Sequence, residues 1–197
     1  CLKIVIERYT LPEMGRIWTE NAKFQSWLKV EIAACEANCS LGKMPEAALK
    51  EIRLNAKFEE SRIKEIEKEV KHDVIAFLTN INEYVGDSGR YIHVGMTSSD
   101  VLDTGLSLQL KDSCELLLEE IKKLENEVRS LARKHKNTLM IGRSHAIHGE
   151  PISFGFKLAG WLAEILRDKK RLLILKESIS IGQISGAMGT YANTNPE

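Results

Sequence analysis

DVLDTGLSLQLKDSCELLLEEIKKLENEVRSLARKHK, residues 100 to 136, is the stretch that decides the fold of this chain. It contains no proline and no glycine except Gly105, and apolar residues recur along it at Leu106, Leu110, Leu117, Ile121, Leu124, Val128 and Leu131. This spacing predicts one continuous helix, because residues three, four or seven apart share a helical face. At ~1.5 Å per residue the helix would exceed ~50 Å, which is longer than a compact small domain is wide. Such a helix usually belongs to a bundle, often one completed by other subunits.

Apolar residues recur at helical spacing elsewhere in the chain. A second long helix is predicted from Pro151 to about Ser178, and shorter helices are predicted at residues 22–41, 45–55, 59–70 and 72–84. Only four prolines and thirteen glycines occur, and the glycines cluster, which disfavours a β-rich fold. We therefore predict an all-α fold, with a small helical N-terminal domain at residues 1–96 and the first long helices of a central bundle at residues 97–197. A monomeric helical bundle is the alternative.

Composition limits the partners of the protein. The 197 residues are 43% hydrophobic and 28% charged, with 28 basic and 28 acidic side chains. Zero net charge gives no long-range attraction to nucleic acid or acidic lipid, and no apolar run is long enough to span a bilayer. The four cysteines show no paired CxxC spacing, so a reduced, cytoplasmic protein is expected. Because the chain begins with Cys1 rather than methionine, we expect it to be cut at one or both ends.

GMTSSD, residues 95–100, directly precedes the longest predicted helix. Thr97 and Asp100 have the spacing of a capping box, which would stabilise the helix start by ~1 kcal/mol. A helix N-terminus rich in hydroxyl groups also suits a carboxylate or a phosphate, because free N–H groups point outward there. His93 lies just upstream. The sequence leaves both interpretations open.

KHDV, residues 71–74, places Lys71, His72 and Asp73 together at a predicted helix boundary. From spacing alone a polar helix cap is the favoured interpretation, because a histidine beside an aspartate is a weak signal of catalysis.

The connection GRSHAIHGEP, residues 142–151, carries Arg143, Ser144, His145 and His148 between the two long helical patterns. Two histidines three apart could share a metal ion, but no local Cys, His or Asp completes a ligand set. His148, next to Ile147 and near Pro151, is expected to pack in this corner. For His145 we favour a function, since a histidine can donate a proton to a leaving group near neutral pH.

GQISGAMGTYAN, residues 182–193, is too rich in glycine to continue the preceding helix. It contains neither a P-loop motif nor a GxGxxG motif after a strand. We interpret it as a turn or an active-site loop.

Several motifs occur together in one order: IERYT (6–10), IWTENAKFQSWLKVEIAACEA (17–37), KHDVIAF (71–77), HVGMTSSDVLDT (93–104), GRSHAIHGEP (142–151) and SGAMGTYAN (185–193). In this combination the chain resembles the fumarase/aspartase superfamily and, within it, the adenylosuccinate lyase family. The likeness runs through almost the whole chain. It implies a fumarase/aspartase-like helical fold and a homotetramer whose active sites are shared between subunits.

The resemblance also implies the reaction, a step of purine nucleotide biosynthesis. Fumarate would be released by β-elimination from adenylosuccinate, giving AMP, and from succinylaminoimidazole carboxamide ribotide, giving the carboxamide ribotide. No metal ion or other cofactor is implied. The partners are a small nucleotide substrate and further copies of the chain, with no nucleic acid and no membrane.

Roles follow residue by residue from the matched motifs. His145 corresponds to the general acid, and His72 is expected to support it. Thr97 and Ser98 are expected to bind a succinyl carboxylate, with Ser144 beside the acid. The other expected substrate-binding residues are Arg8 and Tyr9 at the phosphate, Lys71, His72 and Asp73 on the nucleotide side, and His93 on the carboxylate side.

The chain departs from the family pattern in a few places. Ser144 stands where threonine is usual, and Ser99 replaces the usual threonine of the Ser-Thr-Asp motif, but both keep a hydroxyl group. The family's signature loop, SSxMPxKxNP, which carries the serine base, has no match here, so we expect it beyond Glu197 and expect residues 1–197 alone to be inactive. Alternatives are another fumarate-releasing lyase of the superfamily, such as an argininosuccinate or carboxymuconate enzyme, and a non-catalytic helical assembly fragment.

Overall fold

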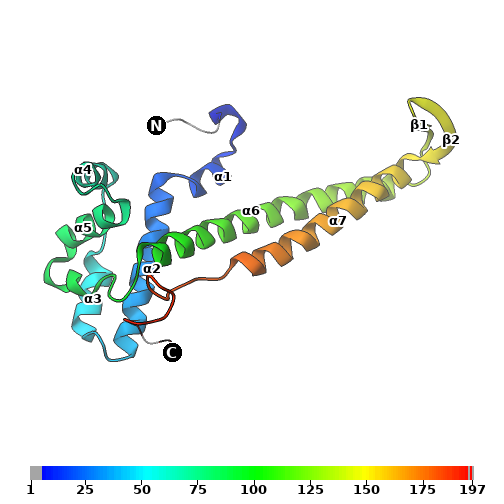
Figure 1. Ribbon diagram of the computed structural model, residues 1–197. Coiled ribbons are helices and arrows are strands. Elements are labelled where there is room, and N and C mark those ends of the chain that lie inside the picture. The colour runs from blue at the N-terminus through cyan, green and yellow to red at the C-terminus, as the bar shows by residue number, and fades with distance from the viewer. Residues whose placement is uncertain (1–5, 195, 197) are drawn as a thin grey trace. The chain divides into compact units, whose positions relative to one another are not determined.

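The computed structural model describes residues 6–194 and Pro196. Helices dominate it, as predicted (Figure 1). The elements are η1 (Glu7–Tyr9), α1 (Pro12–Ile17), α2 (Glu20–Ser40), α3 (Glu46–Asn55), α4 (Glu60–Val70), α5 (Asp73–Val85), η2 (Gly86–Tyr91), α6 (Ser98–Lys134), β1 (Leu139–Ser144), β2 (Ile147–Ser153) and α7 (Phe154–Ile179).

The chain divides into two compact units. The first unit comprises residues 1–110 and 180–197, and the second comprises residues 111–179. The domain boundary predicted from the sequence, between residues 96 and 97, stays a prediction.

Helix ends follow local chemistry. Thr19 begins α2, and its hydroxyl oxygen accepts the N–H of Ala22 at 3.1 Å, which is the usual way to satisfy a free donor at a helix start. Pro45 and Glu59, the predicted starts of two helices, stand just outside α3 and α4, which begin one residue later.

Two features differ from the prediction. The helix α1 was not foreseen, and the second long helix begins at Phe154 rather than Pro151. Pro151 and Ile152 instead belong to β2, which pairs antiparallel with β1. The local pattern could not show this, because an apolar residue at a strand end also fits the helical repeat that follows it.

Aromatic packing forms the core of the first unit. Phe24 and Trp27 of α2 meet Phe77 of α5, with ring centroids 5.2 to 5.6 Å apart, and all three side chains are buried. Phe58 closes the cluster at 5.7 Å from Phe24. Such rings bury large apolar areas, so this cluster contributes strongly to the packing of α2 against α5.

The start of α6 packs into the same core through Val101 and Gly105. Val101 is fully buried, and a Cβ on Gly105 would lie 2.7 Å from Cδ1 of Trp27. Glycine in a helix interior is destabilising by roughly 0.5–1 kcal/mol relative to alanine. Close packing against Trp27 therefore accounts for the glycine in α6.

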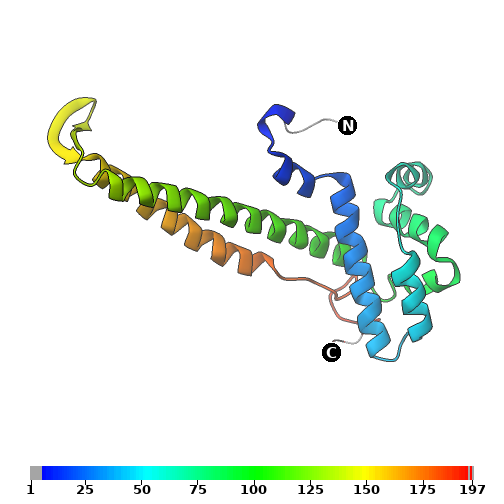
Figure 2. The ribbon, with the colours of Figure 1, turned by 180° about the vertical axis from the view of Figure 1, so that it is seen from behind.

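The second unit is a pair of long helices joined by the β-hairpin, as Figures 1 and 2 show. From Lys111 onward α6 runs beside α7, and ion pairs join the two: Lys169 Nζ lies 2.8 Å from Glu125 Oε2, and Lys176 Nζ lies 2.7 Å from Glu115 Oε1. The hydrogen bond from Lys169 lowers the pKa of Glu125. None of the helices within residues 6–194 is long and apolar enough to cross a membrane.

Replacing Gly105 with alanine tests the contact with Trp27. Helix propensity alone would favour Gly105→Ala by up to about 1 kcal/mol, but the added methyl group must displace Trp27, so we expect a net loss of about 1–3 kcal/mol. Guanidinium unfolding followed by tryptophan fluorescence measures this change. Gly160→Ala in α7 is the matched control, because its Cβ would meet no atom within 4 Å. Equal stability of Gly105→Ala and the unmodified chain would contradict this account of the core.

Candidate functional site

A buried carboxylate organises the start of α6. Asp100 is 0% exposed, and its Oδ2 accepts the N–H of Thr97 at 2.9 Å, as the capping-box spacing predicted. The same oxygen accepts the N–H of Gly186 at 3.0 Å, and Oδ1 accepts the N–H of Ser185 at 3.1 Å. One side chain thus joins the GMTSSD segment to the glycine-rich loop, a link that the sequence did not reveal.

Two further contacts hold the glycine-rich loop against this helix start. The hydroxyl of Thr104 donates to the carbonyl oxygen of Gln183 at 3.1 Å and accepts the N–H of Gln183 at 3.0 Å. Gly95 has a φ of +78°, and a Cβ there would lie 2.5 Å from the carbonyl oxygen of Asn193. Only glycine fits both this backbone conformation and this close approach. The interpretation of residues 182–193 as a loop is confirmed, and the loop lies beside the predicted carboxylate-binding residues.

His72 joins this group from the neighbouring helix. Its Nδ1 accepts the N–H of Ile75 at 3.4 Å, so His72 caps α5 as the favoured interpretation held. Since Nδ1 is then an acceptor, the neutral ring carries its proton on Nε2, which lies 3.4 Å from Oγ of Ser98. The capping role and a role in a polar site are therefore compatible. Asp73 accepts the N–H of Val74 at 2.8 Å, and Lys71 has a left-handed φ of 56°.

His93 has a partner that the sequence analysis missed. Its Nδ1 lies 2.6 Å from Oε1 of Glu31 in α2, and Glu31 is 1% exposed. The available signal was that Glu31 occupies a core position of the apolar repeat through Phe24, Trp27, Leu28 and Cys35, where a charged residue is unusual.

Cys35, one turn after Glu31, is not a candidate nucleophile. Burial, followed by the negative charges of Glu31 and Glu36, raises the pKa of its thiol to about 12. Its Sγ lies 3.7 Å from the carbonyl oxygen of Tyr91. A protonated, buried thiol of this kind is a packing group.

Arg8 and Tyr9 lie in η1 and contact each other. The guanidinium carbon of Arg8 is 4.8 Å from the centre of the Tyr9 ring, and Nη2 donates to the Tyr9 hydroxyl at 3.3 Å. Both side chains are exposed. In the described part of the chain, no hydrogen bond or ring contact joins this pair to the residues around Asp100.

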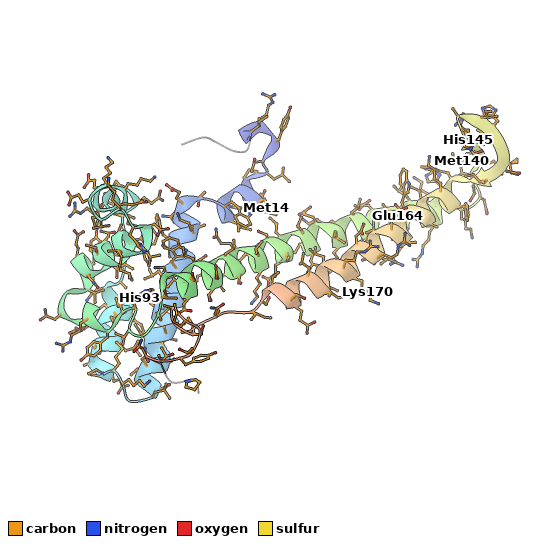
Figure 3. All side chains as sticks on the ribbon, viewed as in Figure 1. Met14, His93, Met140, His145, Glu164 and Lys170 are labelled. Atoms are coloured by element: carbon orange, nitrogen blue, oxygen red, sulfur yellow. The ribbon has the colours of Figure 1, made fainter. Side chains whose placement is uncertain are left out.

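Ser144 and His145 belong to the second unit, where the predicted connection is a β-hairpin. Ser144 pairs with Ile147 across a two-residue turn, in which His145 and Ala146 have φ values of 50° and 61°. Two left-handed residues are typical of a type I′ turn, which normally uses Asn-Gly. Figure 3 shows His145 at the tip of this hairpin, and its side chain is exposed.

His148, which pairs with Arg143 in the register of the hairpin, is also exposed. The expectation that it packs in this corner was therefore wrong, because the strand turns its side chain to solvent rather than toward a helix. No group of three or more His, Cys, Asp or Glu side chains in the described ranges is arranged to hold a metal ion.

Comparison with known proteins identifies the class. A family model described as "Lyase" matches residues 7–197, and the chain belongs to this lyase family. Among curated proteins it is 63% identical over 193 residues to the adenylosuccinate lyase of Synechocystis sp. (strain ATCC 27184 / PCC 6803 / Kazusa), and 50% identical over 196 residues to that of Aquifex aeolicus (strain VF5). The alignments cover 98% of this chain but 45% of each relative. The resemblance to the adenylosuccinate lyase family is confirmed.

Solved structures agree on the fold. The chain is similar to a fumarate lyase from Mesorhizobium sp. BNC1, with a TM-score of 0.86 and 29% identity over 91% of this chain and 43% of that one. It is also similar to a 3-carboxy-cis,cis-muconate lactonizing enzyme from Pseudomonas putida, with a TM-score of 0.87 and 30% identity over 94% of this chain and 44% of that one. The predicted fumarase/aspartase-like helical fold is thus confirmed.

Replacing Asp100 with asparagine tests the link between the two segments. Asparagine offers one acceptor oxygen and turns an NH2 group toward N–H donors, so we expect Asp100→Asn to reduce the free energy of unfolding by about 2–4 kcal/mol. Amide hydrogen exchange at Ser185 and Gly186 should accelerate. Asp103→Asn, an exposed position on the same helix, is the matched control. Unchanged exchange at both amides in Asp100→Asn would show that the carboxylate does not anchor the loop.

Proposed function

We propose that the complete protein is an adenylosuccinate lyase, which releases fumarate from adenylosuccinate and from succinylaminoimidazole carboxamide ribotide. The observation that carries this proposal is the 63% identity over 193 residues to a relative of that name. The chain covers 45% of that relative, so the activity is assigned to the whole protein rather than to these residues alone. Purine nucleotide biosynthesis and a cytoplasmic location follow from the same proposal.

The proposed reaction is an elimination across a carbon–carbon bond. A base removes the proton next to a succinyl carboxylate, which leaves a dianion that hydrogen-bond donors must stabilise. The carbon–nitrogen bond then breaks, and the departing nitrogen takes up a proton, for which we assign His145 as the general acid. The base is assigned to a part of the complete protein outside residues 1–197.

The start of α6 suits one succinyl carboxylate. Thr97 and Ser98 offer hydroxyl groups beside the first N–H groups of α6, where the helix dipole favours negative charge. Asp100 holds this segment in place through the N–H of Thr97. We assign Thr97 and Ser98 to the carboxylate, with Ser144 beside the acid. The contact of His72 with Ser98 supports a site shared by the nucleotide and succinyl groups.

The remaining assignments concern the nucleotide. Arg8 and Tyr9 are proposed to bind the phosphate, for which an exposed guanidinium beside a phenol hydroxyl is suitable. Lys71, His72 and Asp73 are proposed to line the nucleotide side, and His93 is proposed to lie on the carboxylate side.

A homotetramer with shared active sites is part of the proposal. The apolar stripe of α6 remains open, with Leu117 44%, Leu124 51% and Leu131 40% exposed. A long helix with such a stripe is stabilised by further helices. The exposure of His145 supports the same idea, because an efficient general acid needs a site from which bulk water is excluded.

A second candidate is another fumarate-releasing enzyme of the superfamily, such as an argininosuccinate lyase. The similarity to structures of a fumarate lyase and a muconate lactonizing enzyme favours this candidate. The sequences of these two structures are 29% and 30% identical to the chain, whereas the adenylosuccinate lyase relative is 63% identical to it. The exposed Arg8–Tyr9 pair also favours a phosphorylated substrate.

Fumarate release by the full-length protein tests the proposal. We expect His145→Ala to lower kcat by roughly 10²–10⁴-fold, because proton donation to the leaving nitrogen is lost. Absorbance at the substrate's ultraviolet band, with light scattering to confirm the assembly, measures this effect. His148→Ala on the same hairpin is the control and should retain activity.

The outcomes separate the parts of the proposal. Unchanged turnover in His145→Ala would remove its assignment as the acid. A folded, full-length protein that released no fumarate from either purine substrate would contradict the substrate class itself, and the second candidate would then be tested with argininosuccinate.

A further inference from the structure

Glu31 is a charged residue in the core of the first unit. It lies in α2 between the buried Leu28 and Cys35 and is 1% exposed. Removal of a carboxylate from water is costly unless the group is paired and hydrogen-bonded. A side chain that served only to fill this position would be apolar, as its neighbours are.

The partner of Glu31 is His93, which comes from the loop before α6. The distance from Nδ1 of His93 to Oε1 of Glu31 is 2.6 Å, and the two residues are 62 apart in sequence. An ionised carboxylate is an acceptor only, so Nδ1 carries the hydrogen of this bond. Nε2 has no hydrogen-bond partner among residues 6–194 and is the nitrogen left for a ligand. The histidine side chain keeps 18% exposure.

Two unfavourable features meet at this pair. The second oxygen of Glu31, Oε2, is buried without a hydrogen-bond partner among the described residues. The backbone of His93 is left-handed, with a φ of 64°, a conformation that residues other than glycine rarely adopt. Buried unsatisfied atoms and strained backbone persist where the surrounding structure enforces them, and they concentrate at functional sites.

The location of His93 connects the pair to the proposed site. Its carbonyl oxygen accepts the N–H of Met96 at 3.3 Å, which forms a turn that leads directly to Thr97 and α6. Figure 3 shows His93 beside the start of α6. The Glu31 contact therefore fixes a ring on the same short segment that presents Thr97 and Ser98.

We propose that Glu31 is a positioning residue for substrate binding: its buried carboxylate holds Nδ1 of His93, so that Nε2 is the atom presented to the substrate. This inference rests on the proposed lyase function and assigns a role to a residue for which the resemblance implied none. Glu31 does not touch the substrate itself and acts through the orientation and tautomer of the His93 ring.

Steady-state kinetics of the full-length protein with adenylosuccinate tests this role. We expect Glu31→Gln to raise KM about tenfold and to leave kcat within about threefold, because a misoriented ring weakens binding without altering the acid or the base. Glu36→Gln is the matched control on the same helix, since Glu36 is only partly buried and pairs with Arg53 at the surface. It should match the unmodified protein in both constants.

A double-variant comparison separates positioning from general stability. If Glu31 acts through His93, adding Glu31→Gln to His93→Gln should change kcat/KM by less than about twofold. Independent, multiplying losses in the double variant would overturn the proposal, as would unchanged kinetics in a folded Glu31→Gln protein. Absence of fumarate release by the unmodified protein would instead reject the proposed function, so the two failures are distinguishable.

Neutron diffraction from crystals of the unmodified full-length protein provides a test that needs no variant to fold. A deuteron on Nδ1 of His93, directed at Glu31, is the expected result. A ring with Nδ1 bare and the deuteron on Nε2 alone would overturn the proposal.

Discussion

The carboxylate of Asp100 is the interaction on which the arrangement of the first unit depends. It accepts the N–H groups of Thr97, Ser185 and Gly186, and Gly186 lies 86 residues from Asp100 in the sequence. A buried charge is tolerable only when such donors surround it. The same bonds that stabilise Asp100 therefore determine where the glycine-rich loop lies, and they hold the start of α6 in a defined conformation beside it.

The helices could be predicted because their information is local. Apolar residues at three- and four-residue steps and a capping residue such as Thr19 specify a helix without reference to the rest of the chain. The hairpin around His145 could not be predicted, because its turn lacks the Asn-Gly pair that marks a type I′ turn. An unfavourable backbone at this point is maintained by the pairing of β1 with β2 rather than by the turn residues themselves.

The contacts of the candidate site could not be predicted either, because they do not depend on local sequence. Motifs identified His72, Thr97 and Ser98 as residues to consider, but the link between Asp100 and the glycine-rich loop and the pairing of Glu31 with His93 join segments that are far apart in sequence. Side-chain contacts of this kind depend on tertiary packing. The one sequence signal for Glu31 was a charge at a core position, which indicates a partner without saying which residue it is.

The two polar contacts of the first unit differ in how completely they are satisfied. Asp100 receives three N–H groups, so its burial is compatible with a purely stabilising role. Glu31 receives one donor and leaves Oε2 without a partner among the described residues, so stability alone does not account for a carboxylate there. A group retained at such a cost is better explained by what it does to His93. By this contrast Asp100 stabilises the fold, whereas the proposed role of Glu31 is to position His93 for substrate binding.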